Sequence, residues 1–380
     1  MNKNRNSHFL RIYHICILYI FFILFWGLRP FNFRPINGVE WLNNENGISV
    51  QDLGIVYGPS KLKDFYQAPL FAEHQPMSIE IWLTPGSFGN DRFSSIFCLF
   101  DGQQREIFSL SQVRSLLNIS KYQMPGKKGS THNWRWLKNA FFKGQRQFLT
   151  ITSDKAGTIV YLNGRKAIRY RNYELMPARK LAPNWRMIIG NDYSGTKPWT
   201  GEIYGLAIYN HALSPERVNE HFVKWRGKNA LSLLKEIKLI AIYPMDEKNG
   251  QIIRNAVRNQ FHLSIPARFK ILKKNFLKLS VNSLKLNGSS LRDMNINIFG
   301  FIPLGCLLLV TIYSAKSSLT SSWRLIFLAI LGGTVISLVV EILQAFLPTR
   351  NSSLTDLIFN ALGTGLGVIL ASMFIKLKNP

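Results

Sequence analysis

The chain has 380 residues and a net charge of +26, with long apolar runs near both ends and a polar, aromatic middle. This length leaves room for a membrane part and one large folded domain. Of the three cysteines only Cys98 lies in the middle part, which excludes a disulfide within that domain, and the sequence contains no Cys/His spacing of the zinc type.

The first apolar run covers residues 12–28 and follows the basic residues Lys3, Arg5 and Arg11. Its length matches what a helix needs to cross a bilayer. A cleavable signal peptide would continue into small residues at a cleavage site, whereas this run continues into Arg29-Pro30. We therefore predict that residues 1–38 form a cytoplasmic N-terminus and an uncleaved first transmembrane helix.

Residues 39–287 have no long helical apolar period, and short alternating runs are separated by turn signals instead. The dipeptide Asn163-Gly164 is the strongest of these signals, because it tolerates positive φ at both central positions of a hairpin turn. Ser214 and Pro215 predict the N-cap and first position of a short helix. The predicted strands include residues 78–84, 148–153, 158–162, 187–190 and 202–209. Many short strands with regular turns predict an all-β sandwich.

Three segments of this region, SIEIWLTP, FLTITSDKAGTIVYLNGRKA and MIIGNDYSGTKPWTGEIYGLAIYNHALSPERV, follow one another in the chain. Their order resembles the laminin-G-like, concanavalin A-like jelly roll over residues 46–225, with residues 226–287 completing the sandwich. The resemblance implies binding of a carbohydrate or another ligand. Glycan-cleaving enzymes of this fold carry clustered carboxylates, commonly E-x-D-x-x-E, because hydrolysis needs two of them close together. The sequence lacks this motif, so we do not expect glycosidase activity.

Two kinds of ligand site are considered for the sandwich. Calcium sites are common in this fold, and Asp52, Asp101 and Asp192 are candidate ligands, although single Asp residues in loops more often form turns. The second kind is a sugar-stacking surface. Its candidates are Trp134, Trp136 and Trp199, which alternatively pack in the core or at the membrane interface.

Three further apolar runs, at residues 296–313, 325–347 and 354–375, predict a helical transmembrane region within residues 288–380. Lys316, Arg324, Lys376 and Lys378 flank these runs on the side that also carries the basic N-terminus, and the positive-inside rule makes that side the cytoplasm. The β domain then lies outside the cytoplasm, which argues against a nucleic-acid partner. Residues 251–292 carry nine basic residues and no acidic one on the outer side, where we hypothesise contact with anionic headgroups.

Polar residues inside the predicted spans form a pattern. Ser337, Glu341 and Gln344 share one helix face, and Asp356 and Asn360 lie four residues apart on the next helix. Polar groups are costly in a bilayer and usually pair inside the bundle, and Arg350 in the connecting loop is placed to meet either carboxylate. The Gly363 and Gly367 pair, spaced G-x-x-x-G, predicts close helix packing.

This pattern resembles the VanZ-like family. Asn297, Gly300, Phe301, Pro303 and Gly305 lie in a segment similar to the family's N-x-x-x-F-x-P-x-G helix. The segments S-x-x-x-E-x-x-Q from Ser337 and R-x-x-x-x-x-D-x-x-x-N-x-x-G from Arg350 match its remaining motifs. Family members often carry another acid where this chain has Ser353, which puts any role of that second carboxylate in doubt. The family takes its name from a protein linked to reduced teicoplanin susceptibility and brings no accepted catalytic mechanism.

We predict a four-span α-helical transmembrane bundle with a concanavalin A-like β-sandwich inserted between spans 1 and 2. It would lie in a bacterial cytoplasmic membrane, with both termini in the cytoplasm. The leading hypothesis is an envelope protein without demonstrated enzymatic chemistry whose β domain binds a glycan, a peptidoglycan precursor or another envelope component. One alternative is an enzyme or transporter acting on a lipid-linked envelope precursor through Glu341, Arg350 and Asp356. The other is a plain membrane-anchored adhesin.

Overall fold

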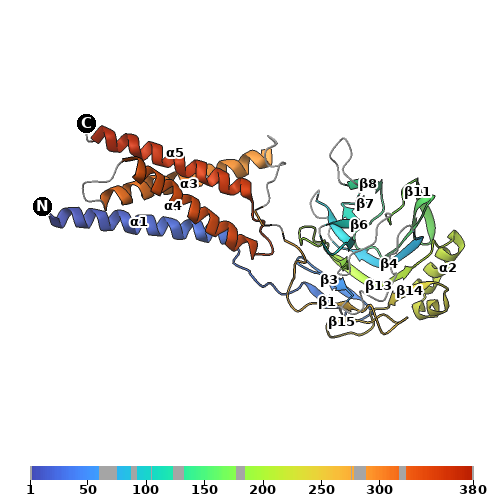
Figure 1. Cartoon of the computed structure of the whole chain (residues 1–380). Helices are drawn as coiled ribbons and strands as arrows, with labels where there is room; N and C mark the ends of the chain where they lie inside the picture. The colour runs from blue at the N-terminus through green and yellow to red at the C-terminus, as the bar shows by residue number, and fades with distance from the viewer. Residues whose placement is uncertain are drawn as a thin grey trace. The chain divides into compact units, whose positions relative to one another are not determined.

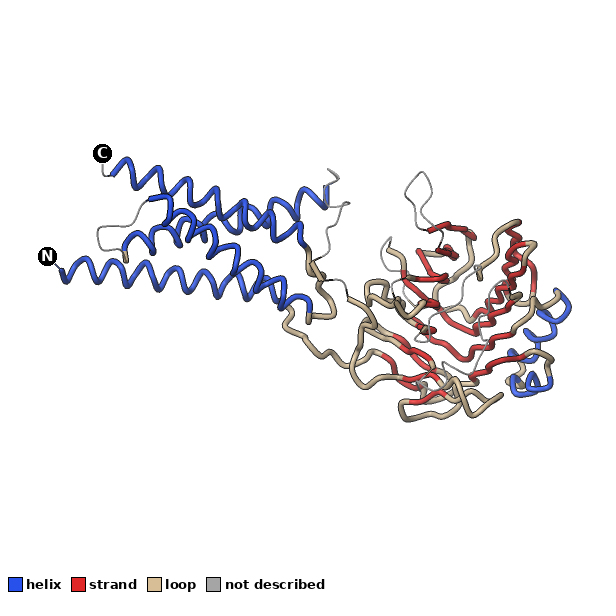
Figure 2. Tube along the Cα trace, in the orientation of Figure 1, coloured by secondary structure: helices blue, strands red, loops and turns tan. Residues whose placement is uncertain are grey.

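The computed structural model describes residues 2–59, 75–86, 92–103, 105–122, 132–176, 185–274, 276–277, 288–315 and 322–378. The chain divides into two compact units. The first joins Met1–Arg34 to Lys274–Pro380, and the second is Pro35–Lys273. All described strands belong to the second unit, so the β-rich part is an insertion between the first long helix and the other three, as the sequence predicts (Figures 1 and 2).

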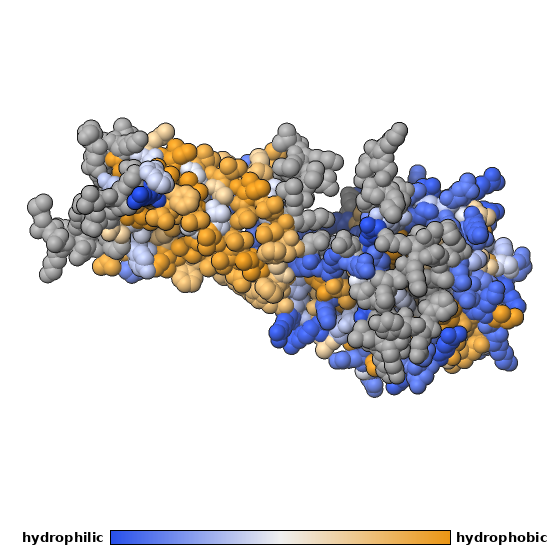
Figure 3. Space-filling view, viewed as in Figure 1, coloured by the Kyte–Doolittle hydropathy of each residue, from blue (hydrophilic) through white to orange (hydrophobic). Residues whose placement is uncertain are grey.

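Four long helices build the first unit: α1 (Asn2–Leu28), α3 (Gly288–Ser314), α4 (Ser322–Ala345) and α5 (Leu354–Lys378). Each contains an apolar stretch long enough to cross a bilayer, at Leu10–Leu28, Leu291–Ser314, Trp323–Ala345 and Leu354–Ile375. Large apolar side chains such as Phe21, Phe327 and Phe374 are exposed on the helices, whose visible surface is largely hydrophobic (Figure 3). The prediction of four spans is confirmed.

Several helix ends differ from the predicted spans, and two of these differences have a clear physical cause. Helix α3 begins at Gly288, ahead of the predicted start at 296, because helical hydrogen bonding continues through the polar Arg292 and Asp293. Helix α4 ends at Ala345, two residues before the predicted end, because Pro348 disfavours helical backbone at the residue before it. Lys316, one of the residues behind the predicted orientation, lies outside the described residues.

Two antiparallel sheets build the second unit. The first has the strand order β1-β2-β13-β4-β9-β10-β11, with β14 beside β13, and the second has the order β15-β16-β3-β12-β5-β6-β7-β8. The first sheet comprises β1 (Val39–Trp41), β2 (Ile48–Val50), β4 (Met77–Pro85), β9 (Gln147–Asp154), β10 (Gly157–Leu162), β11 (Arg165–Arg171), β13 (Gly201–Tyr209) and β14 (Leu239–Tyr243). The second comprises β3 (Val56–Gly58), β5 (Ser94–Phe100), β6 (Glu106–Val113), β7 (Leu116–Tyr122), β8 (His132–Leu137), β12 (Arg186–Ile189), β15 (Ile252–Ile253) and β16 (Leu263–Ser264).

One apolar core lies between the two sheets. Ile79 and Ile81 of β4 and Leu149 of β9 point into it, as the alternation of those strands predicts. Burial of each such side chain stabilises the fold by about 1.5–3 kcal/mol relative to exposure. Asn163 and Gly164 have φ angles of 50° and 77° and connect β10 to β11, so the predicted hairpin is present.

Helix α2 (Pro215–Arg226) covers part of the outer face of the first sheet and is followed by the short 3-10 helix η2 (Ala230–Lys235) (Figure 1). The Ser214 hydroxyl accepts the Arg217 N–H at 3.4 Å, and Pro215 occupies the first helical position, as predicted. Strands β14 and β16 pair with β13 and β3, so both sheets gain strands from the part of residues 226–287 that the structure describes.

Candidate functional site

The outer face of the second sheet carries an exposed aromatic surface at strand β8. In β8 the residues His132, Trp134 and Trp136 alternate with Asn133 and Arg135, so the first three lie on one face of the sheet. The Trp134 side chain is 50% exposed and that of Trp136 is 40% exposed. We call these two tryptophans and their neighbours on this face the tryptophan face.

Polar side chains lie beside both tryptophans. In the register of β7 and β8, Trp136 is opposite Asn118 and Trp134 is opposite Ser120. Facing residues of an antiparallel pair project to the same side of the sheet. The Phe93 ring lies 5.6 Å from that of Trp136 and extends the aromatic surface. The tryptophan face therefore has two exposed ring platforms, about 7 Å apart along the strand, with buried polar neighbours on β7.

An ion pair of the buried Glu106 with the partly exposed Lys197 lies next to this face. Glu106 is buried and accepts hydrogen bonds from Ser109 Oγ at 2.6 Å, Ser120 Oγ at 2.8 Å and Lys197 Nζ at 3.0 Å. Burial alone would raise the pKa of Glu106, but the Lys197 charge and the two hydroxyl donors outweigh it and lower that pKa. The Glu106 and Asp192 carboxylates outweigh burial in turn and raise the pKa of Lys197. The pair stays charged at neutral pH, and its carboxylate fixes the Ser120 hydroxyl next to Trp134.

Trp199 does not belong to a sugar-stacking surface, which corrects the sequence prediction. Its side chain is fully buried in the core, and its Nε1 donates to Gln112 Oε1 at 2.7 Å. A ring enclosed on both faces cannot stack on a ligand, so Trp199 takes the packing role that the sequence left open for it.

The three candidate calcium ligands have separate positions. Asp101 accepts the backbone N–H groups of Gln103 and Arg105 at 2.8 and 2.9 Å, and Asp192 accepts the N–H of Thr196 at 2.9 Å, so both stabilise their own turns. Asp52 is exposed. Within the described residues, no group of three acidic, His or Cys side chains gathers as metal ligands. Calcium binding remains an untested expectation.

In the helical unit, the predicted polar residues link helices to one another. Glu341 of α4 is buried, and its Oε2 accepts the backbone N–H of Ser353 at 2.7 Å. Ser353 caps α5, since its hydroxyl accepts the Asp356 N–H at 3.3 Å. The carboxylate of one helix therefore occupies the positive N-terminus of the next. One turn away from Glu341 along α4, Asn360 Nδ2 donates to Ser337 Oγ at 2.9 Å.

The predicted meeting of Arg350 with a carboxylate is wrong. Its Nε and Nη2 donate to the Arg29 carbonyl at 3.2 and 3.0 Å, and no ion pair joins Arg350 to Glu341 or Asp356, all three being described residues. Gln344 Nε2 likewise donates to the Gly27 carbonyl at 2.8 Å. The last carbonyls of a helix have no intrahelical donor, so these two side chains satisfy the end of α1 instead of completing a charged site.

The sequence analysis did not single out Asp293 or Lys274 of this unit. Asp293 and Asn297 of α3 both neighbour Asp356 of α5. The four-residue spacing of Asp293 and Asn297 on α3 is the signal that would have placed them on one face. Lys274 Nζ donates to the Gln344 carbonyl at 2.9 Å and to the Leu347 carbonyl, at the end of α4. No local pattern marks that contact.

Glycines allow the backbones of α3 and α5 to pack closely against each other. A Cβ on Gly363 would overlap the Ile298 carbonyl, and one on Gly367 would overlap the Ile302 carbonyl. Gly305 faces the α5 backbone in the same way. Gly300 does not act as a packing position, because a Cβ there would meet nothing within 4 Å, and this corrects its assignment.

Pro303 lies inside α3, where its ring leaves the Phe299 carbonyl without the usual donor. Tyr19 of α1 donates to the neighbouring Gly300 carbonyl at 2.9 Å. The segment that sequence motifs mark as a packing helix is therefore tied to α1 by a hydrogen bond as well.

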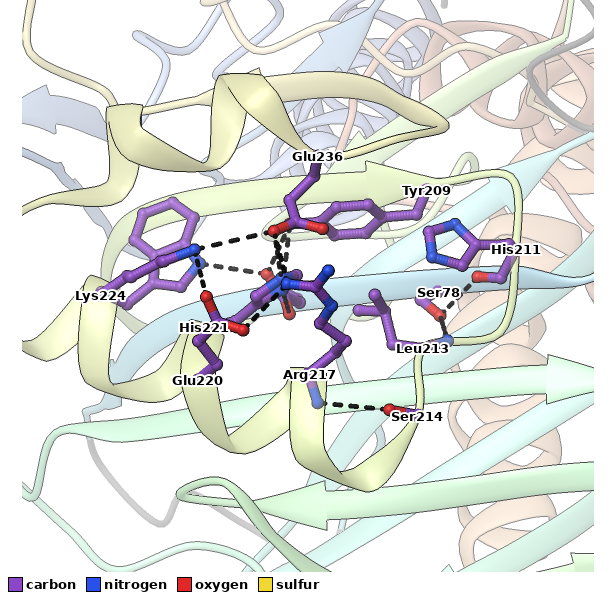
Figure 4. A network of polar contacts seen from close by, with 12 residues as sticks. Ser78, Tyr209, His211, Leu213, Ser214, Arg217, Glu220, His221, Lys224 and Glu236 are labelled. Carbon is purple, nitrogen blue, oxygen red and sulfur yellow. Dashed lines mark hydrogen bonds and ion pairs between the residues drawn. The ribbon is translucent and has the colours of Figure 1, made fainter.

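A polar network that the sequence did not predict lies beneath α2. Glu80 of β4 is fully buried, and its oxygens lie 3.0 Å from Tyr209 Oη, 3.1 Å from Trp225 Nε1 and 2.7 Å from His221 Nδ1. Figure 4 shows Glu236 close to His221, at 3.6 Å from its Nε2. The polar face of β4, which the alternation predicts, is thus covered by α2 instead of facing water.

This geometry defines a class of protein: a four-span membrane protein with an inserted antiparallel β-sandwich. Residues 230–375 match the family model described as VanZ/LLP1, and residues 62–219 match the concanavalin A-like lectin/glucanases superfamily. The chain thus combines a C-terminal segment similar to the VanZ/LLP1 family with a segment similar to the concanavalin A-like lectins, and neither match reaches half of its length. The VanZ/LLP1 match begins at residue 230, inside the β unit, ahead of the predicted start at residue 288. No curated relative matches the chain.

Solved structures similar to this chain share little sequence with it. The receptor-binding domain of a botulinum neurotoxin C/D mosaic serotype is 12% identical over 50% of this chain, with a TM-score of 0.36, and the chain covers 45% of that structure. A SAP-like pentraxin from Limulus polyphemus is 13% identical, with 61% and 94% covered and a TM-score of 0.33. The CBM40 of a Ruminococcus gnavus IT-sialidase, bound to α2,3-sialyllactose, is 14% identical, with 48% and 95% covered and a TM-score of 0.35.

Proposed function

We propose that the β-sandwich binds a glycan of the bacterial cell envelope through the tryptophan face, and that the helical unit holds the domain at the membrane. The observation that carries this proposal is the exposure of Trp134 and Trp136 on one face of β8. Large exposed aromatic side chains are typical of ligand surfaces, since their rings stack on apolar ligand faces. Asn118 and Ser120 lie opposite the two tryptophans but are buried, so the rings carry the proposed contact.

The test uses the full-length chain in lipid nanodiscs and a panel of soluble peptidoglycan fragments and other envelope oligosaccharides. Trp134→Ala combined with Trp136→Ala is compared with Phe142→Ala, an aromatic residue of the same unit that is 47% exposed and lies outside the tryptophan face. We expect at least one probe to bind, the double variant to lose most of that binding, and the control to keep it. Binding that is equal in all three proteins, or absent for every probe, overturns the proposal.

The proposal includes an orientation, in which the β domain lies outside the cytoplasm and both termini lie inside. Its support is the basic residues near the spans, among them Arg11 and Arg324. Cys98 is fully buried and unsuited to labelling, so the test introduces Lys166→Cys at an exposed position of β11. Labelling by a membrane-impermeant maleimide in intact cells, or spheroplasts where an outer membrane exists, supports the orientation. Labelling only after lysis contradicts it.

A cellular readout follows from the same proposal. If the glycan belongs to peptidoglycan or its precursors, cells without the protein should change in teicoplanin susceptibility. The Trp134→Ala, Trp136→Ala variant should then fail to restore it. If that variant restores the wild-type susceptibility, the phenotype does not depend on the tryptophan face.

A further inference from the structure

A cavity lies on the outer face of the first sheet, on the opposite side of the sandwich from the tryptophan face. It has a volume of about 280 Å³ and is bounded by the loop before β2, the β4 and β13 strands, the end of α2 and the segment after β14. We call it the α2 pocket. Its size is near the lower limit of small-molecule sites, roughly 300 Å³, which suits one ring of a longer ligand.

Aromatic rings line the α2 pocket. Trp225 is held by its hydrogen bond to the buried Glu80 at 3.1 Å. Tyr204 is covered on one face by the Arg146 guanidinium at 3.7 Å, and Arg146 is in turn paired with Glu45 at 2.6 Å. Trp82 is partly exposed and offers the open ring. The pocket therefore has a rigid aromatic wall with an accessible surface at Trp82.

Two exposed lysines, Lys228 and Lys248, also line the pocket, and among the described residues neither takes part in an ion pair. With Arg146 they place three cations against the two carboxylates of Glu45 and Asp246. Arg146 and Glu45 pair with each other, so the two lysines dominate the remaining electrostatic potential of the pocket. Both lysines have left-handed backbone, with φ angles of 57° and 63°, a conformation that glycine or asparagine adopts at lower cost.

We propose that the α2 pocket binds an acidic saccharide. The sugar ring lies on Trp82, and the anionic group of the sugar, a carboxylate or a phosphate, is held by the Lys228 and Lys248 ammonium groups. An aromatic wall alone would accept any sugar, and the unpaired lysines supply the preference for negative charge. This site is separate from the tryptophan face and does not depend on it.

The experiment uses the full-length chain in nanodiscs and three probes: trigalacturonate for the carboxylate, glucose 6-phosphate for the phosphate, and neutral maltotriose. The variant Lys228→Asn with Lys248→Asn removes both charges, and asparagine tolerates the left-handed backbone, so the fold is retained. Lys238→Asn is the matched control, because Lys238 is exposed, has a φ of 65° and lies outside the pocket.

We expect one or both acidic probes to bind more tightly than maltotriose, to bind at least tenfold more weakly to the double variant, and to bind the control within twofold of the wild type. Preference for trigalacturonate or for glucose 6-phosphate identifies the anionic group. The Trp134→Ala, Trp136→Ala variant should keep this binding, which distinguishes the two sites. Equal binding of acidic and neutral probes, no binding of either acidic probe, or loss only in the tryptophan variant overturns the assignment.

Discussion

Substitution of Glu341 separates a structural link between helices from a functional site in the membrane. The Glu341 carboxylate accepts the Ser353 N–H at 2.7 Å and joins α4 to the start of α5. Glu341→Gln keeps an oxygen acceptor at the same position and replaces the carboxyl group with a neutral amide. Glu341→Leu has a similar size, and it leaves the Ser353 N–H without its partner.

The contact predicts different losses of stability for the two variants. Interhelical hydrogen bonds in membranes contribute about 0.6 kcal/mol on average and at most about 1.7 kcal/mol. Glu341→Gln keeps such a bond, so we expect a loss below about 1 kcal/mol. In Glu341→Leu the backbone donor at Ser353 is unsatisfied, which costs about 1–3 kcal/mol. The expected order of stability is wild type, Glu341→Gln, then Glu341→Leu.

Thermal unfolding of the purified full chain in one detergent measures this order. Ile342→Leu is the control, since Ile342 is the next residue of α4 and is exposed on the helical unit. Equal stability of Glu341→Leu and the wild type would refute the structural role of the carboxylate. A Glu341→Gln protein that unfolds normally but loses a cellular phenotype would favour a functional membrane site.

Two further predictions concern helix packing and pH. Gly367→Ala should lower the unfolding temperature by the equivalent of about 1–3 kcal/mol, because the added Cβ overlaps the Ile302 carbonyl. Gly300→Ala is the control and should leave the unfolding temperature unchanged, since a Cβ there meets nothing within 4 Å. Equal effects of the two substitutions would contradict this account of the packing of α3 and α5. The pKa of Glu106 is lowered in the folded protein, so its ionised carboxylate stabilises the β unit at pH values above 4.5, the ordinary pKa of the group. This contribution is lost as the pH falls through the pKa of the folded state. The stability difference between wild type and Glu106→Gln should therefore shrink below pH 4.5, and a constant difference from pH 7 to pH 3 would refute it.

Local patterns predicted the elements of this fold well. Apolar length alone determines the four spans, and the Asn163-Gly164 dipeptide predicts its hairpin without knowledge of the rest of the chain. The spacing of Gly363 and Gly367 likewise describes one helix face, and that face contacts α3. Each of these predictions depends only on residues that are close in sequence.

Contacts between segments that are distant in the sequence could not be predicted from such local patterns. Arg350 lies within a few residues of Asp356 in the sequence, yet its hydrogen bonds go to the carbonyl of Arg29, 321 residues away. Trp199 and Trp136 are equally aromatic in the sequence, and only the packing of the sheets places one ring inside and the other outside. The Glu80 network was missed because a polar strand face is expected to meet water, while α2 covers this one.

The central claim is that the tryptophan face binds envelope glycan, and co-sedimentation with purified cell-wall sacculi measures it directly. Exposed ring area of roughly 100 Å² per tryptophan, half of it covered by a sugar, corresponds to about 1.2 kcal/mol for each ring. The full chain in nanodiscs should sediment with the sacculi, and Trp134→Ala with Trp136→Ala should raise the apparent Kd by about 50-fold. Sedimentation of the double variant with the Kd of the wild type would contradict the account.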